Sequence, residues 1–122
     1  MLHPAGLRTA AALLSAAFLS PALAADAFTD AMVAAYGPYR EALFRTNGQS
    51  QLESAQAIAR AQQAWAEVLA RFGQRAPAPY DRDPAFADSL GRVKVVYDTA
   101  AKEIAAGQLA QAHETLEAAR DI

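Results

Sequence analysis

The sequence predicts an all-α fold: an up-down-up-down four-helix bundle whose last helix is short or truncated. Apolar side chains recur at intervals of three and four residues from about Ala27 onward, which is the spacing of one face of an α-helix. Helix-stopping signals at Asn47-Gly48, Gly73 and Gly107 divide this region into four segments. Each segment carries one apolar stripe, which a helix can bury only against other helices.

The first expected helix runs from about Ala27 to Arg45. Gly37-Pro38 lies within it. Because proline removes a helical hydrogen bond and clashes with the preceding turn, we expect a kink or a short break there. The apolar face of this helix consists of Phe28, Met32, Ala35, Tyr39 and Leu43.

The second expected helix opens with a capping box, in which Ser50 and Glu53 satisfy the amides of the first turn. Gly73 ends it. The connection from Gln74 to Asp83 follows, and its alternating alanine and proline residues favour a stiff, extended chain. The apolar seam of this helix consists of Leu52, Ala55, Ile58, Gln62, Trp65, Leu69 and Phe72.

The third expected helix starts at Asp83-Pro84, an acidic N-cap followed by proline in the first turn, and ends at Gly107. Its apolar face consists of Phe86, Leu90, Val93, Tyr97, Ala100 and Ile104. The fourth starts at Gln108 and places Leu109, Ala112, Leu116 and Ala119 on one face. It reaches Ile122 after about 15 residues, roughly 22 Å, so it is short or the natural chain continues.

Residues 1–24 have the pattern of a cleaved secretory signal peptide. A start that carries Arg8 precedes an apolar run from Thr9 to Leu19, and Ala22-Leu23-Ala24 provides an A-x-A cleavage site. The run is about half the roughly 20 residues that span a bilayer, so we expect no permanent membrane insertion. The mature domain is then residues 25–122. An alanine- and arginine-rich exported chain without cysteine is typical of a bacterial periplasm.

Composition excludes several kinds of chemistry. The formal charge of −2 comes from interspersed acids and bases, so no basic surface for nucleic acid is expected. The absence of cysteine excludes disulfides, thiolate nucleophiles, iron–sulfur clusters and covalent c-type haem. No serine–histidine–acid set or phosphate-binding loop is present, so we do not expect an enzyme.

His113 is the main candidate for metal binding. Glu117 lies one helical turn further on, Glu114 is adjacent, and Glu103 on the preceding helix is a further carboxylate. Such a set could hold a divalent metal, yet no Glu-x-x-His motif of the di-metal bundles is present. We favour a flank histidine that pairs with Glu117, and keep His113 and Glu117 as the alternative metal ligands.

The large aromatic residues and Gln62 also have two interpretations. Trp65, Tyr36, Tyr39 and Tyr97 occur at helical spacing, which favours core packing over the lining of a cavity. Gln62 interrupts an apolar seam, and we interpret it as an amide that is bonded across the bundle to a tyrosine, with a ligand pocket as the alternative.

The mature chain also has a recognisable layout. It contains about 100 residues, with Met32 on the first helix, a proline-rich link between the second and third helices, and a glycine turn before an alanine-rich last helix at 107–112. This layout resembles the soluble periplasmic b-type cytochromes (the b-five-six-two class) and the related cytochrome c-prime bundles. The resemblance implies a haem held by a methionine near the start of helix one and a histidine near the end of helix four.

Met32 is the residue that the resemblance assigns to haem, if haem is bound. The other axial ligand is not matched, because His113 lies near the start of the fourth helix. In an antiparallel bundle it should be level with residues 41–45, roughly 16 Å from Met32. A histidine beyond Ile122 would restore the pair, whereas the c-prime type needs a Cys-x-x-Cys-His motif that this chain lacks.

We therefore expect a periplasmic, non-enzymatic helical bundle that binds a small ligand or a protein partner, cytochrome b-like in layout but without haem. The alternative is an electron-transfer protein of the soluble cytochrome b class that holds haem b or a divalent metal. The residues identify neither the ligand nor the partner, and leave the oligomeric state open.

Overall fold

The computed structural model describes residues 27–122, and within this range all regular structure is helical. The first helix covers residues 27–46, and α2 (Gln51–Phe72), α3 (Phe86–Ala105) and α4 (Leu109–Glu117) follow. Two short 3₁₀ helices, η1 (Tyr80–Arg82) and η2 (Ala118–Asp121), lie in the link before α3 and after α4. The predicted all-α class is confirmed. The expected signal peptide, residues 1–24, lies outside the described range.

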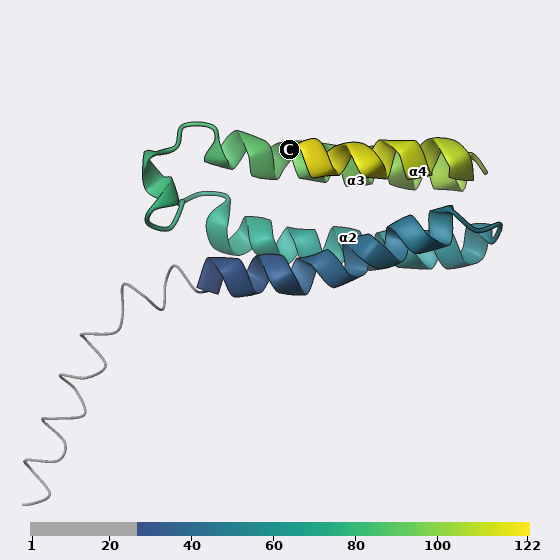
Figure 1. Ribbon diagram of the computed structural model, residues 1–122, viewed down its shortest axis with the longest axis horizontal. Coiled ribbons are helices and arrows are strands. Elements are labelled where there is room, and N and C mark those ends of the chain that lie inside the picture. Colours follow the sequence, from purple (N-terminus) through teal and green to yellow (C-terminus); the bar gives the residue numbers. More distant parts are fainter. Residues whose placement is uncertain (1–26) are drawn as a thin grey trace, which may run out of the picture.

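The helices form a bundle of two layers (Figure 1). The first helix and α2 make one layer, and α3 and α4 make the other. Contacts join α2 to α3 and α3 to α4, while the Tyr39 hydroxyl donates to the Leu116 carbonyl and so joins the first helix to α4 at 2.6 Å. The C-terminal end of η2 stops short of the N-terminal end of α3 (Figure 1), so the fourth segment covers only part of its neighbour.

Small residues occupy the tightest positions of the core. Ala42, Ala57, Ala100 and Ala112 are fully buried, and their short side chains let the helix backbones approach closely. Large side chains fill the space above and below them. The buried large residues are Phe28, Tyr39, Leu43, Ile58, Trp65, Val68, Phe72, Phe86, Leu90, Tyr97, Ile104 and Leu116.

The predicted seam of α2 is correct in part. Ile58, Trp65 and Phe72 are buried, but Leu52 and Ala55 are exposed. The buried face instead includes Ser54, Ala57 and Ala61, because α2 presents its small residues to its neighbours. A search for large apolar side chains therefore placed the start of the buried face on the wrong flank of the helix.

Most of the predicted helix ends agree with the structure. The first helix stops before Asn47, and Ser50 caps α2 by accepting from the Glu53 amide at 3.1 Å. The Glu53 carboxylate binds Arg45 at 3.0 Å, a partner that the capping box did not predict. At the end of α3, Gly107 has φ +77°, the left-handed conformation that favours glycine.

The structure bears on two expectations about proline. At Gly37-Pro38 it contradicts the break but does not test the kink, since helical structure continues from residue 27 to 46. The link before α3 is not a stiff extended segment, because it contains η1, from which Tyr80 packs on Phe28 and Phe86 with ring centroids 5.1 and 5.4 Å away. These aromatic contacts hold the link against the end of the bundle.

Membrane insertion can be assessed only for the described helices. Within residues 27–122, no helix combines the length and the apolar character that spanning a bilayer requires.

Candidate functional site

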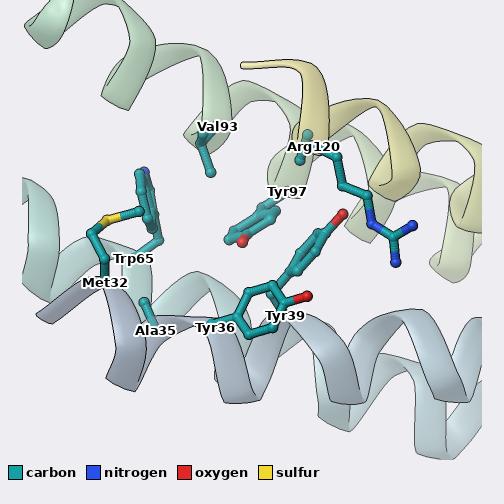
Figure 2. Close-up of a pocket in the computed structure, with 9 residues that line it drawn as sticks. Met32, Ala35, Tyr36, Tyr39, Trp65, Val93, Tyr97 and Arg120 are labelled. Atoms are coloured by element: carbon teal, nitrogen blue, oxygen red, sulfur yellow. The ribbon is translucent and has the colours of Figure 1, made fainter. Parts of the chain in front are cut away.

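A cavity of about 150 Å³ lies between the two layers, near the end of the fourth segment. We call it the Met32–Arg120 cavity. Residues from the first helix, α2, α3 and η2 line it, so it exists only in the assembled bundle (Figure 2). The lining residues are Met32, Ala35, Tyr36, Tyr39, Trp65, Val93, Tyr97, Ala119 and Arg120.

Four of the nine residues that line the cavity are aromatic. Tyr97 stacks on Tyr39, with ring centroids 6.0 Å apart, and meets Trp65 edge-on at 6.1 Å. The Trp65 indole nitrogen donates to the Leu90 carbonyl at 2.8 Å, which fixes the orientation of the ring. Rings that are held by packing and hydrogen bonds change position little, so the wall is preorganised.

The hydroxyls of the two buried tyrosines of the cavity have different environments. The Tyr39 hydroxyl donates to the Leu116 carbonyl at 2.6 Å. The Tyr97 side chain is only 4% exposed, yet its hydroxyl has no hydrogen-bond partner among residues 27–122. Figure 2 shows this hydroxyl directed into the space between Trp65 and the first helix. Glu103 alone among the described residues has a fully buried side-chain oxygen without a partner, so the Tyr97 hydroxyl oxygen keeps contact with the open space and is free to bond to water or to a ligand there.

Burial also sets the protonation state of these hydroxyls. It raises the pKa of Tyr97 far above its ordinary value, with a further contribution from Tyr39. It raises the pKa of Tyr39 as well, although the nearby Arg120 guanidinium opposes that shift. Both groups, which are neutral around pH 7 even at the ordinary tyrosine pKa, stay neutral to higher pH, and the Tyr97 hydroxyl is able to donate or to accept a hydrogen bond.

Arg120 is the one charged residue in the lining. It is exposed, and within the described part of the chain it forms no ion pair. The nearby Glu117 carboxylate lies 3.2 Å from His113 instead. The cavity is thus apolar in its interior and positive at its Arg120 side.

A second space of about 150 Å³ lies on the α2–α3 side of the same two rings, Trp65 and Tyr97. Gln62 donates to Asp98 at 2.9 Å there, and Lys94 binds the same carboxylate. The predicted cross-bundle bond of Gln62 exists, but its partner is an aspartate, not a tyrosine. The hydrogen bond from Lys94, followed by that from Gln62, lowers the pKa of Asp98.

His113 lies in the middle of α4, whereas Arg120 lies in η2. Its Nε2 is 3.2 Å from Glu117, as predicted. In addition, its Nδ1 lies 3.0 Å from the Leu43 carbonyl and 3.1 Å from the Thr46 hydroxyl, so this histidine bridges α4 and the first helix. One oxygen of Glu103 is buried without a partner. Among residues 27–122, no group of three or more histidine or acidic residues is placed to hold a metal ion.

Met32 and His113 do not share a site. Met32 lines the cavity beside Trp65 (Figure 2), whereas His113 contacts Leu43, about eleven residues or roughly 16 Å further along the first helix. A cavity of about 150 Å³ matches one benzene-sized molecule, and a porphyrin is several times larger. Met32 and His113 are therefore too far apart in the described structure to bind one haem iron together.

The sequence identified most of the cavity wall but not the cavity. Four aromatic residues were expected in the core. Trp65, Tyr39 and Tyr97 are buried, whereas the expectation is wrong for Tyr36, which is 52% exposed. All four border an open space. Arg120 was not singled out, since nothing in the sequence places it beside these rings. No protein-family model matches the chain, and neither a curated protein nor a solved structure matches it significantly.

Proposed function

We propose that this chain is a non-enzymatic binding protein whose Met32–Arg120 cavity takes one small, mainly apolar molecule that carries a polar group. The unpaired Tyr97 hydroxyl, directed into an aromatic cavity, is the observation that carries this proposal. A pocket with apolar walls and a few convergent polar groups is the usual form of a small-molecule site.

The dimensions of the cavity define the size of the ligand. An engineered apolar cavity of about 150 Å³ in another protein binds benzene, and the Met32–Arg120 cavity has the same volume. Under this proposal the protein carries no haem. Cells that are supplied with haem should yield a colourless protein, whereas a Soret band in the purified protein would favour the electron-transfer alternative.

Phenol provides a direct test, because it combines a ring with one hydroxyl. Trp65 is the one tryptophan of the chain and lines the cavity, so its fluorescence, excited where phenol is transparent, should change saturably as phenol binds. Ala35→Leu extends a side chain into the cavity and should abolish this response.

The matched control is Ala34→Leu, which makes the same change at an exposed neighbouring position. This variant should bind phenol like the unmodified protein, and circular dichroism should show both variants folded. An unsaturable response, or equal binding by the two variants, would contradict the proposed site.

We also propose an up-down-up-down topology and export to the periplasm. The contacts of Tyr39 with Leu116 and of His113 with Leu43 support antiparallel packing of the first and last helices. The signal pattern of residues 1–24 supports export. A periplasmic fraction should contain protein that starts within a residue or two of Ala25, and full-length chain in the inner membrane would contradict this proposal.

A further inference from the structure

We propose that the ligand of the Met32–Arg120 cavity is a single-ring phenolic carboxylate, with 4-hydroxybenzoate as the simplest example. This inference rests on the proposed binding function and specifies its ligand class. It assigns the ring to the aromatic wall, the phenol to Tyr97 and the carboxylate to Arg120.

The wall favours a flat aromatic ring. Trp65 and Tyr97 meet edge-on, with centroids 6.1 Å apart, so together they present two surfaces to a ligand. The Met32 thioether lies beside Trp65 in Figure 2, and sulfur makes favourable contacts with aromatic rings. Rings gain from edge and offset contacts of this kind beyond the apolar area that they bury. The volume of about 150 Å³ admits one ring.

The interior end of the cavity selects a hydroxyl group. The Tyr97 hydroxyl is neutral near pH 7, as any tyrosine is, and burial raises its pKa further. It has no partner among the described residues. It can therefore both donate to a ligand hydroxyl and accept from it. A ligand without a polar atom at this position would leave the Tyr97 hydroxyl unpaired, and that lowers affinity.

The Arg120 side of the cavity selects an anion. Arg120 is the only charged lining residue, and no carboxylate in residues 27–122 pairs with it. Figure 2 places Arg120 beyond Tyr39, away from the Tyr97 hydroxyl. The two polar groups therefore mark different ends of the cavity, and a ligand that uses both needs its polar groups at opposite ends of the ring. A carboxylate is the group that an arginine binds with matched geometry.

Three ligands that differ by one group test this assignment. They are 4-hydroxybenzoate, benzoate, which lacks the hydroxyl, and 4-hydroxybenzyl alcohol, which lacks the charge. We expect 4-hydroxybenzoate to bind most tightly, by about tenfold over the alcohol and about threefold over benzoate, since charge-assisted hydrogen bonds are stronger than neutral ones. Equilibrium dialysis measures all three affinities without an optical signal.

Two variants assign each preference to its residue. Arg120→Gln should remove the preference for 4-hydroxybenzoate over the alcohol, and Tyr97→Phe should remove its preference over benzoate. The control is Arg71→Gln, which makes the same charge change at an exposed arginine of α2 that lies over Phe72, outside the cavity lining. This control should leave both preferences unchanged.

The outcomes separate this inference from the proposed function. If phenol binds but the alcohol equals or exceeds 4-hydroxybenzoate, or if Arg120→Gln leaves their ratio unchanged, the phenolic-carboxylate assignment is wrong and the binding function stands. If neither phenol nor any of the three ligands binds, both are wrong. The assignment is supported if Arg120→Gln removes only the preference over the alcohol, if Tyr97→Phe removes only the preference over benzoate, and if Arg71→Gln keeps both preferences.

Discussion

Removal of a single oxygen atom from Tyr39 or from Tyr97 should affect stability very differently. Both side chains are at least 95% buried and their rings stack on each other, so the two tyrosine-to-phenylalanine variants are a matched pair. Tyr39→Phe loses the 2.6 Å hydrogen bond to the Leu116 carbonyl. Tyr97→Phe loses no bond within the described protein, because its hydroxyl faces the cavity.

The magnitudes follow from these contacts. Loss of a buried hydrogen bond lowers the free energy of unfolding by about 1–2 kcal/mol, which for a domain of this size lowers Tm by about 5–10 °C. Tyr97→Phe should change the free energy of unfolding by less than about 0.5 kcal/mol, and in the stabilising direction if the cavity is dry. Urea unfolding followed by circular dichroism at neutral pH measures both. A Tyr97→Phe variant as destabilised as Tyr39→Phe would refute the assignment of an unpaired hydroxyl.

Both tyrosines also link stability to alkaline pH. Burial raises both pKa values above the ordinary 10.0, so the unfolded chain loses these protons at lower pH than the folded protein does. The contribution of the two protonated hydroxyls to the free energy of unfolding is complete below about pH 10, and it is lost as the pH rises through their raised pKa values in the folded protein. Tyr97→Phe should therefore flatten the alkaline decline in stability, and an unchanged decline would contradict the burial of this group.

Three further predictions follow from other contacts. Trp65→Ala should lower the free energy of unfolding by about 3–5 kcal/mol, and Trp65→Phe by less; a loss below about 1 kcal/mol in urea unfolding of the alanine variant would contradict burial of the indole. Asp98→Asn should reduce the loss of stability below about pH 4, because the lowered pKa of Asp98 stabilises the fold above that range; equal acid unfolding of both proteins would refute this link. His113→Gln should lower the free energy of unfolding by about 1 kcal/mol or more, because the contact of His113 with the Leu43 carbonyl is lost, and it should leave the metal content unchanged. If elemental analysis finds stoichiometric metal in the native protein and none in the variant, His113 is a metal ligand.

Local signals in the sequence predicted the helices well. Glycines at 73 and 107 and the Ser50 cap mark helix ends, and four-residue spacing identified the buried faces of the first helix and α3. Of the kink or break expected at Gly37-Pro38, the break does not occur, because packing in a bundle outweighs one lost hydrogen bond. The predicted start of the buried face of α2 was wrong, because small residues and not large ones make the closest contacts there.

The candidate site was predictable only in part, because it depends on contacts between segments far apart in the chain. The aromatic residues could be chosen from their spacing, but spacing does not distinguish a filled core from one with a cavity. The Tyr39 hydroxyl is paired only because the fold brings it to the Leu116 carbonyl, 77 residues away, and nothing local in the sequence shows that the Tyr97 hydroxyl has no such partner. Arg120 enters the site only because η2 ends beside the first helix.

The methyl group of Met32 offers the most direct test that the cavity is a ligand site. After removal of the expected signal peptide, Met32 is the only methionine, so protein labelled with ¹³C at the methionine methyl should give one NMR resonance from inside the cavity wall. Titration with 4-hydroxybenzoate should shift this resonance saturably, since a bound ring lies against the thioether, and Ala35→Leu should prevent the shift. A Met32 resonance that stays in place at ligand concentrations up to the solubility limit would contradict the account.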